Sequence, residues 1–532
     1  MEKRIFANGR IVTLEKERPF VEAVYTEGGR IRGLGSTKEI LLQFGRPAVE
    51  IIDLEGGFAC PGLTDNHLHL MAYGMKLSLL DFTGLTSKEG VLQALRERVE
   101  RTPSGQWVLG LNWDENRMME GTPLTREELD RVAPGHPVML TRVCYHVQAV
   151  NSRAIEAAGL TLDAPDPAEG AFGRDARGQL NGLVYENASL PFREALPPLT
   201  FAEKKELART AASGALARGL TAVHTEDLRD AGSVRDLTRI YRELTQEGTL
   251  LRTHHLIYHP FLEELRDAGL TAGDGDEWFR IGAAKIFADG SIGGRTAWLA
   301  EPYTDDPSTC GMAIHTGEEM NGLVREAREH GMPVAVHAIG DGAAEQVVRA
   351  LEAIPLSGRF MPDRLIHAQI LNRGLMERLQ RLPMVLDIQP RFVVSDFPWI
   401  TERVGNERLS FAYAWRTLLE AGIPCGGGSD APIEPIDPLL GIHAAVTRRD
   451  PSDPEHPGWL PEQKITLLEA LRLFTVGGAR SVGEERERGT VGPGKWADLS
   501  VFDRDLLSGE PDTLLEARAV MTIVNGRVAY RV

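Results

Sequence analysis

The sequence predicts an α/β protein built around a (β/α)₈ barrel, and three observations support this fold class. Between residues 61 and 485, short β-rich segments alternate with amphipathic helical segments, a pattern typical of parallel strands joined by helical crossovers. Eight strand segments can be counted, the number that closes such a barrel. The two ends of the chain contain only short strands and turns, with too little apolar surface to fold alone.

The eight barrel strands follow one another at spacings that mostly suit one strand and one helix each. Helical i, i+3, i+4 apolar spacing marks segments 203–217, 320–330 and 467–482. The strands are expected at 63–70, 220–226, 253–258, 281–288, 333–338, 364–368, 385–389 and 423–430.

The gap between the first two strands is far longer than an ordinary crossover. We therefore expect an inserted subdomain at about residues 75–200, with strands at 106–111 and 138–142 and a hairpin or loop at 170–182.

The N-terminal residues 1–60 and the C-terminal residues 486–532 share a second pattern, of short strands and tight turns. Because neither end can fold alone, we expect both to pair into one small β-sandwich. Its strands are expected at 10–14, 23–26, 31–34, 51–54, 499–502, 520–524 and 527–529.

Charge and hydropathy narrow the class of protein. The 532 residues include 59 Lys and Arg against 76 Asp and Glu, a formal net charge of −17, and an acidic surface repels phosphate backbones and anionic membranes. Charges interrupt the N-terminal residues, and no segment has the roughly 18 apolar residues of a membrane span. We expect a cytoplasmic protein with neither nucleic-acid nor membrane partners.

Cysteine usage argues against two kinds of site. Cys60, Cys144, Cys310 and Cys425 are scattered without a C-x-x-C pair, unlike a disulfide framework or a thiolate zinc site. Each is expected to be a small buried apolar residue.

Two histidines at the first strand are the strongest local signal for chemistry. His67 and His69 end the segment PGLTDNHLH, and strand periodicity turns both imidazoles to one face, as a bidentate metal grip requires. On this motif alone, two solvated or hydrogen-bonded histidines are an equally good interpretation.

Four later residues stand at or near the ends of other predicted strands, where the chemistry of such barrels gathers. Lys285 lies within an otherwise apolar strand, so we expect it to have a partner or a modification, because burying an ammonium is costly. His337, His367 and Asp430 end later strands. Taken singly, an ion-paired lysine, hydrogen-bonded core histidines and a turn aspartate remain alternatives.

Taken together, these positions resemble the amidohydrolase superfamily, specifically the YtcJ-like and N-substituted formamide deformylase-like branch called amidohydrolase family 3. The resemblance covers nearly the whole chain and is specific for the family, not for a substrate. It is carried by segments 61–69, 285–290, 294–297, 336–341, 364–367, 428–432 and 494–498.

The resemblance implies a binuclear metal centre, usually of zinc, held by six side chains. One ion would be held by His67, His69 and Asp430. The other would be held by His337 and His367, and an N-carboxylated Lys285 would bridge the two.

The resemblance also implies a reaction. A hydroxide between the metals would attack an amide-like substrate, possible near neutral pH because the ions lower the pKa of bound water. Asp430 would act first as general base and then as general acid while the C–N bond, such as that of an N-acyl or N-formyl amine, breaks.

Substrate contacts are predicted from weaker signals. His146 matches a Gly-His position of the family, although Tyr145 replaces the glycine; it is a candidate catalytic oxyanion donor or substrate contact, and a structural role is an equal alternative. Trp113 and Arg391 are further candidate substrate contacts. With Tyr303, Phe392 and Trp399 also near the expected mouth, and the insertion as a lid, we expect a small-molecule substrate with an apolar or aromatic substituent.

Two other functions stay open. One is a mononuclear-metal deaminase of the same superfamily, acting on a heterocyclic amine; one tight zinc per chain would favour it. The other is a non-catalytic amidohydrolase-like scaffold, which gives no reason to retain six costly polar groups at one mouth. Relatives are often dimeric, so a homodimer is an expectation from the resemblance alone.

Overall fold

The computed structural model describes residues 2–143, 146–167, 170–358 and 361–532. The chain forms two compact units. Unit 1 comprises Met1–Tyr73 and Lys204–Val532, and unit 2 comprises Gly74–Glu203.

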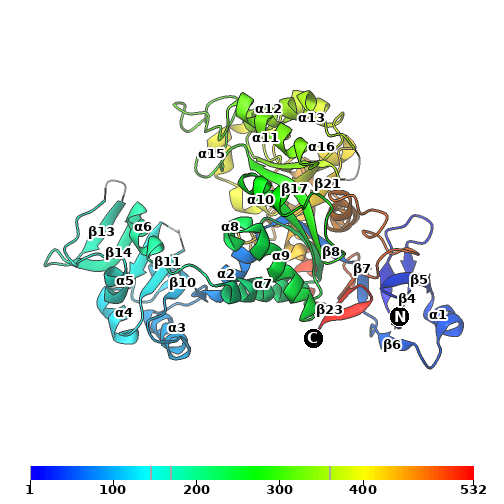
Figure 1. Ribbon diagram of the computed structural model, residues 1–532, viewed down its shortest axis with the longest axis horizontal. Coiled ribbons are helices and arrows are strands. Elements are labelled where there is room, and N and C mark those ends of the chain that lie inside the picture. Colours follow the sequence, from blue (N-terminus) through cyan, green and yellow to red (C-terminus); the bar gives the residue numbers. More distant parts are fainter. Residues whose placement is uncertain (1, 144–145, 168–169, 359–360) are drawn as a thin grey trace. The chain divides into compact units, whose positions relative to one another are not determined.

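Unit 1 contains the predicted barrel. Its eight parallel strands are hydrogen-bonded to one another in chain order, which confirms their predicted number and order. Three of them, β8, β17 and β21, are labelled in Figure 1. The eight strands are β8 (Leu63–Leu68), β15 (Leu220–Thr225), β16 (Arg252–Tyr258), β17 (Phe279–Phe287), β18 (Val334–Ala338), β19 (Asp363–His367), β20 (Met384–Ile388) and β21 (Cys425–Gly427).

Hydrogen bonds between the end of β8 and the segment that follows β21 bring the two edges of the barrel together. The amide of Asp430, just after β21, donates to the carbonyl of His67 at 2.8 Å, and the amide of His69 donates to Ala431 at 2.8 Å. Glycine allows this close approach, because a Cβ at Gly428 would lie 2.7 Å from the backbone nitrogen of His67. The barrel edge therefore brings Asp430 beside the two histidines of β8.

Helices pack around these strands, among them α9 (Val234–Gln246), α11 (Gly317–Glu329), α12 (Asp341–Ala353) and α17 (Pro438–Thr447). The helix expected over 467–482 is divided into α18 (Leu467–Arg472), a π-helical turn and α19 (Gly478–Arg480). The wide turn lies tightly against the barrel, since a Cβ at Gly477 would lie 2.3 Å from the carbonyl oxygen of Cys425.

The sandwich differs from the expectation in the origin of one sheet and in three strands, at 3–7, 20–21 and 58–61, that the sequence did not predict. One sheet, in the order β5-β4-β1-β6, comes from the N-terminus alone, and only the other, β24-β23-β22-β7-β2-β3, combines both termini. Phe6, Val24, Leu499 and Ile523 belong to one shared apolar core. The strands are β1 (Lys3–Ala7), β2 (Arg10–Val12), β3 (Phe20–Val21), β4 (Ala23–Glu27), β5 (Arg30–Gly35), β6 (Glu50–Asp53), β7 (Phe58–Pro61), β22 (Leu499–Phe502), β23 (Ala519–Val524) and β24 (Arg527–Arg531).

Unit 2 is built on a six-stranded mixed sheet in the order β13-β14-β12-β11-β10-β9. The strands expected at 106–111 and 138–142 are β10 (Val108–Trp113) and β11 (Val138–Arg142), and the expected hairpin is β13 (Gly170–Arg174) with β14 (Leu180–Glu186). Helices α3 (Lys88–Arg101) and α4 (Arg126–Val132) contribute to its apolar core.

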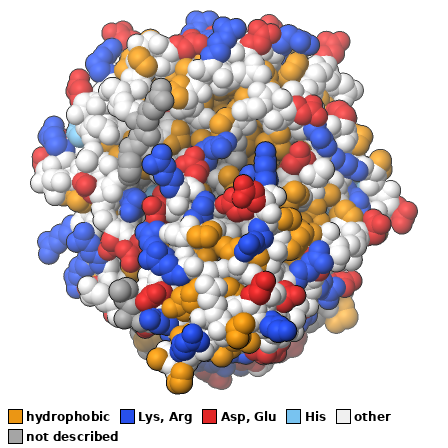
Figure 2. Space-filling model, turned by 90° about the vertical axis from the view of Figure 1, so that its right-hand side faces the viewer, with side chains coloured by type: hydrophobic (Ala, Val, Ile, Leu, Met, Phe, Trp, Pro, Cys, Tyr) orange, Lys and Arg blue, Asp and Glu red, His pale blue; other side chains and the backbone are white. Residues whose placement is uncertain are grey.

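Acidic and basic side chains are intermixed on the face drawn in Figure 2, so the negative net charge is not gathered into one patch there. Among the described residues, no helix combines the length and apolar character needed to cross a membrane.

Candidate metal centre

Six polar side chains stand at the C-terminal ends of five barrel strands in unit 1. Three of them have ligand atoms within 4.8 Å of one another, which is close enough to share one ion. These three are His67 at the end of β8, His69 just beyond it, and Asp430 after β21.

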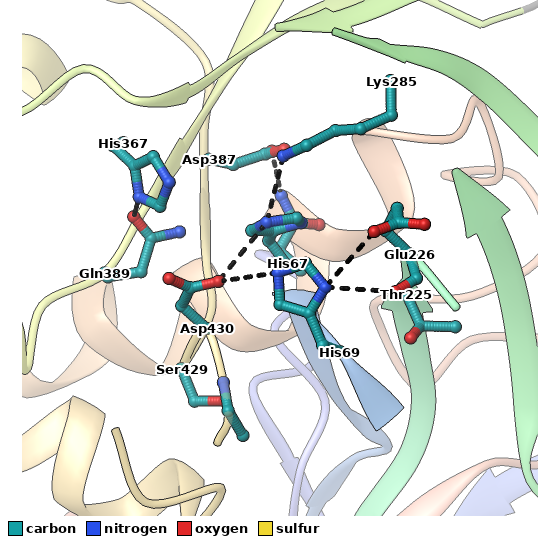
Figure 3. A network of polar contacts seen from close by, with 12 residues as sticks. His67, His69, Thr225, Glu226, Lys285, His367, Asp387, Gln389, Ser429 and Asp430 are labelled. Atoms are coloured by element: carbon teal, nitrogen blue, oxygen red, sulfur yellow. Dashed lines mark hydrogen bonds and ion pairs between the residues drawn. The ribbon is translucent and has the colours of Figure 1, made fainter. Parts of the chain in front are cut away.

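Asp430 faces both histidines (Figure 3). Its Oδ1 lies 3.5 Å from Nε2 of His67 and 3.5 Å from Nε2 of His69. Lys285, inside β17, approaches from the opposite side, with Nζ 3.3 Å from Nε2 of His67. The first three predicted ligands and the predicted bridge therefore converge on one point.

His337 and His367 form the neighbouring pair. Their ring centroids are 4.5 Å apart, and the His367 centroid lies 5.9 Å from that of His67. The structure thus brings all six predicted ligands into one continuous group at the barrel mouth.

In three of the histidines, one ring nitrogen is held by an acceptor, which leaves the other nitrogen for a ligand. Nδ1 of His69 lies 3.1 Å from the carbonyl oxygen of Glu226, and Nδ1 of His367 lies 2.8 Å from Oε1 of Gln389. Nε2 of His337 lies 3.0 Å from the carbonyl oxygen of Gly290. Orientation by such a hydrogen bond is typical of metal-binding histidines.

Burial sets the charge of these imidazoles. It lowers the pKa of His67 well below its ordinary value and the pKa of His367 to about 3, so both rings are neutral, the form that binds a metal. Burial also lowers the pKa of His69, but hydrogen bonds to Asp430 and Glu226 outweigh it and raise the pKa to about 10. The acids beside His69 therefore favour its protonated ring, which would have to release a proton before it binds a metal.

Lys285 is fully buried. No ion pair with a carboxylate reaches its ammonium among the described residues, and burial lowers its pKa to about 7. The Phe287 ring lies 4.7 Å from Nζ. A buried amine in these surroundings is costly as a cation.

Sequence reasoning missed two residues that hold the ligands. Glu226, directly after β15, contacts His69, and Gln389, directly after β20, orients His367. Both stand at the C-terminal ends of barrel strands, the same signal that identified Asp430. His224, inside β15, is buried, and its Nε2 lies 3.1 Å from the guanidinium of Arg488.

A cavity of about 330 Å³ adjoins the group and is lined by residues of unit 1 alone. Three of the six ligand candidates, His337, His367 and Asp430, lie in its wall. The other lining residues are largely apolar or small: Ser291, Ile292, Gly293, Ile339, Gln369, Phe392, Ser395, Asp396, Trp399 and Ile433.

Only some of the predicted substrate contacts line this cavity. Phe392 and Trp399 line the cavity, whereas Arg391 is not among its lining residues and donates from Nε to Glu434 at 3.0 Å. Trp113 is only 1% exposed in the core of unit 2, where its indole donates to the carbonyl of Leu140. This burial contradicts the expectation that Trp113 offers a surface to the substrate.

His146 and Tyr303 were also expected near the substrate. His146 is exposed on unit 2, and its Nδ1 lies 3.0 Å from Glu186. Tyr303 is buried, and its hydroxyl donates to the carbonyl of Ala297.

Of the cysteines, Cys60 and Cys425 are buried and Cys310 is half-buried, while Cys144, like Tyr145, lies outside the described residues.

Comparisons with known proteins agree on one family. A sequence model of the amidohydrolase family matches residues 50–530. YtcJ of Bacillus subtilis (strain 168) is 42% identical over 530 residues and 99% of each chain. N-substituted formamide deformylase of Arthrobacter pascens is 27% identical over 100% of this chain and 98% of that protein. An uncharacterized metal-dependent hydrolase from Pyrococcus furiosus aligns with a TM-score of 0.78 and 31% identity, over 95% of this chain and 100% of that chain.

Proposed function

The chain belongs to the amidohydrolase family, and from that premise we propose that it hydrolyses the C–N bond of a small amide-like substrate, such as an N-acyl or N-formyl amine. The metal-dependent hydrolase class follows from the family and from its structural relative. The observation that carries the finer proposal is the convergence of six ligand-type side chains beside an open cavity.

The residues fit two divalent ions, most simply zinc. His67, His69 and Asp430 would hold one ion through atoms that already lie within 4.8 Å of each other. His337 and His367 would hold the second, each through the ring nitrogen that its backbone or amide acceptor leaves free. When bound, the ions would lower the pKa of a bound water and act as a Lewis acid toward the substrate carbonyl.

Lys285 would bridge the ions as a carbamate. Its neutral amine would add to carbon dioxide, forming an N–C bond and releasing one proton, so that a buried amine becomes an anion. Full burial and the absence of an ion-paired carboxylate among the described residues support this reaction, because they disfavour the ammonium. Protein grown with ¹³C-bicarbonate should give a carbamate carbon signal by NMR that Lys285→Ala lacks.

Asp430 is the residue we assign to proton transfer. It is buried, lies in the cavity wall, and has no arginine or lysine ion pair among the described residues. Its carboxylate would accept the proton of the attacking water and return it to the departing nitrogen, so one group serves as base and then as acid.

A substrate screen tests the reaction class. Metal-loaded protein is assayed against N-acyl and N-formyl amines in parallel with esters, lactones and organophosphates. We expect amine release from amides, and activity confined to esters or organophosphates would overturn the amide proposal. Release of ammonia from heterocyclic amines, together with one tight metal per chain, would instead identify the mononuclear deaminase.

A further inference from the structure

The cavity beside the metal centre holds more negative than positive side chains. Two carboxylates, Asp396 and Asp430, lie in its wall, and none of its lining residues is lysine or arginine. Asp430 belongs to the proposed centre. Asp396, the last residue of α14 (Phe392–Asp396), has no part in the proposed reaction and therefore needs a separate explanation.

One oxygen of Asp396 is held firmly. Its Oδ2 accepts hydrogen bonds from the hydroxyl of Tyr413 and from Nε2 of Gln369, both at 2.6 Å. These two donors are themselves joined by a side-chain hydrogen bond, and the amide of Tyr413 donates to the carbonyl of Gln369 at 2.9 Å. The carboxylate is thus fixed in place by two neutral groups.

The other oxygen is open. Within the described parts of the chain, no hydrogen bond or ion pair reaches Oδ1 of Asp396. Burial and the negative charge of Glu434 raise the pKa of Asp396 to about 6, although the hydrogen bonds from Tyr413 and Gln369 lower it. Among the described residues no lysine or arginine forms an ion pair with Asp396 itself, whereas Glu434 is paired with Arg391. A carboxylate that only needed to satisfy Tyr413 would not have to face a cavity with its second oxygen free.

We propose that Asp396 is a specificity-determining residue that binds a cationic nitrogen group, an ammonium or a guanidinium, on the substrate. A charge-assisted hydrogen bond to the free oxygen would supply the missing positive charge. Ile292, Ile339 and Ile433 in the same wall would accept a short hydrocarbon chain between this group and the reacting amide. This inference rests on the proposed function and defines its substrate class as small amides that carry a second, positively charged nitrogen.

The test compares a cation with a neutral molecule of the same shape. Binding of n-butylguanidinium and of n-butylurea to the zinc-loaded protein is measured by isothermal titration calorimetry. We expect the wild-type protein to bind the cation at least about tenfold more tightly, and Asp396→Asn to reduce this preference to within about twofold. Asparagine can still accept from Tyr413 through its one oxygen, while its NH2 group replaces the open oxygen, so the variant removes both the charge and the acceptor that the cation would use.

Glu402→Gln is the matched control. Glu402 is an exposed acid of α15 (Ile400–Val404) that does not line the cavity, so the variant loses one negative charge and should keep the tenfold preference. Equal binding of the two molecules to the wild type, or an unchanged preference in Asp396→Asn, would overturn the inference. If Asp396→Asn does not fold, the two binding constants of the wild type are measured at increasing salt concentration. A preference that depends on charge must weaken as ionic strength rises. A preference that does not weaken refutes the role of Asp396.

Binding is measured without turnover, so the two proposals fail separately. If the protein prefers the cation through Asp396 but cleaves no amide, the role of Asp396 stands and the proposed reaction is wrong. A protein that cleaves neutral amides and shows no preference would keep the proposed function and lose the role of Asp396.

Discussion

The barrel contains two groups of histidines, and among the described residues only one of them has side-chain ligand atoms close enough to share a metal ion. At the mouth, His67 and His69 face Asp430, which has no guanidinium partner among the described residues. Elsewhere in the barrel, His224 and His254 lie with ring centroids 5.2 Å apart, a spacing much like that of the mouth pair. Residue type and spacing alone therefore do not separate the two groups.

The two histidine groups differ in the charged side chains that surround their carboxylates. Nε2 of His254 lies 3.0 Å from Glu484, and the same carboxylate is bound by Arg488 at 2.6 Å and by Arg280 at 3.2 Å. Two guanidinium groups around one carboxylate leave no negative charge for a cation. At the mouth, Glu226 is also paired with an arginine, Arg229, but Asp430 has no arginine partner among the described residues. The free charge of Asp430 supports the proposal that this cluster holds the metal.

The largest effect is expected from Asp430→Asn. The variant removes both a ligand and the group assigned to proton transfer, so kcat/KM should fall by about a thousandfold or more, with a loss of bound metal. Activity assays and elemental analysis measure both, and a normal thermal unfolding curve shows that the fold is kept. Full activity and metal content in this variant would remove the distinction between the two clusters.

Glu484→Gln should affect stability instead of metal binding. It leaves the buried Arg488 and the half-buried Arg280 without their carboxylate, which should lower the free energy of unfolding by about 3 kcal/mol. Denaturant unfolding measures this loss, and the metal content should not change. The neighbouring exposed Glu485→Gln serves as control and should cost less than about 0.5 kcal/mol. Loss of metal from folded Glu484→Gln would show that the clusters are not independent.

Gln389→Ala tests whether the orientation of His367 matters for metal binding at the mouth. Without the acceptor at 2.8 Å, His367 is no longer held with its other nitrogen toward the site, so metal affinity or activity should fall by about 10- to 100-fold. Competition with a chelator measures the affinity. The exposed Gln380→Ala should leave it unchanged, and an equal loss in both variants would argue against an orienting role.

The smallest effect is a pH dependence of stability. Burial raises the pKa of Glu484, but His254 and Arg488 outweigh it and lower the pKa below its ordinary value of 4.5. A depressed folded pKa stabilises the protein above pH 4.5, and that stability is lost as the pH falls further. Between pH 5 and 3 the wild type should therefore lose about 1–2 kcal/mol more than Glu484→Gln. Parallel pH curves of the two proteins would contradict this origin.

The barrel and its six ligand candidates could be predicted because both follow from local patterns. Strand periodicity identifies the segments, and the ends of parallel strands meet at one mouth, so residues such as His367 and Asp430 can be placed together from the sequence. Strand β1 was missed because Lys3 and Arg4 mask the apolar residues that follow them, although Ile5 is buried.

Other features depend on contacts that no local pattern contains. The pairing of His254 with Glu484 joins residues 230 positions apart. Trp113 was expected at the substrate because aromatic residues often line cavities, but its indole fills the core of unit 2. The role of Asp396 could not be predicted from the sequence, because its position depends on hydrogen bonds from Tyr413 and Gln369, which lie on other segments.

Anomalous diffraction at the zinc absorption edge, from crystals of the zinc-loaded protein, tests the two-ion centre most directly. Two peaks are predicted at the barrel mouth, one beside His67, His69 and Asp430 and one beside His337 and His367, with density for a carbamate on Lys285 between them. A single peak beside His67 and His69, with an unmodified Lys285 amine, would contradict it.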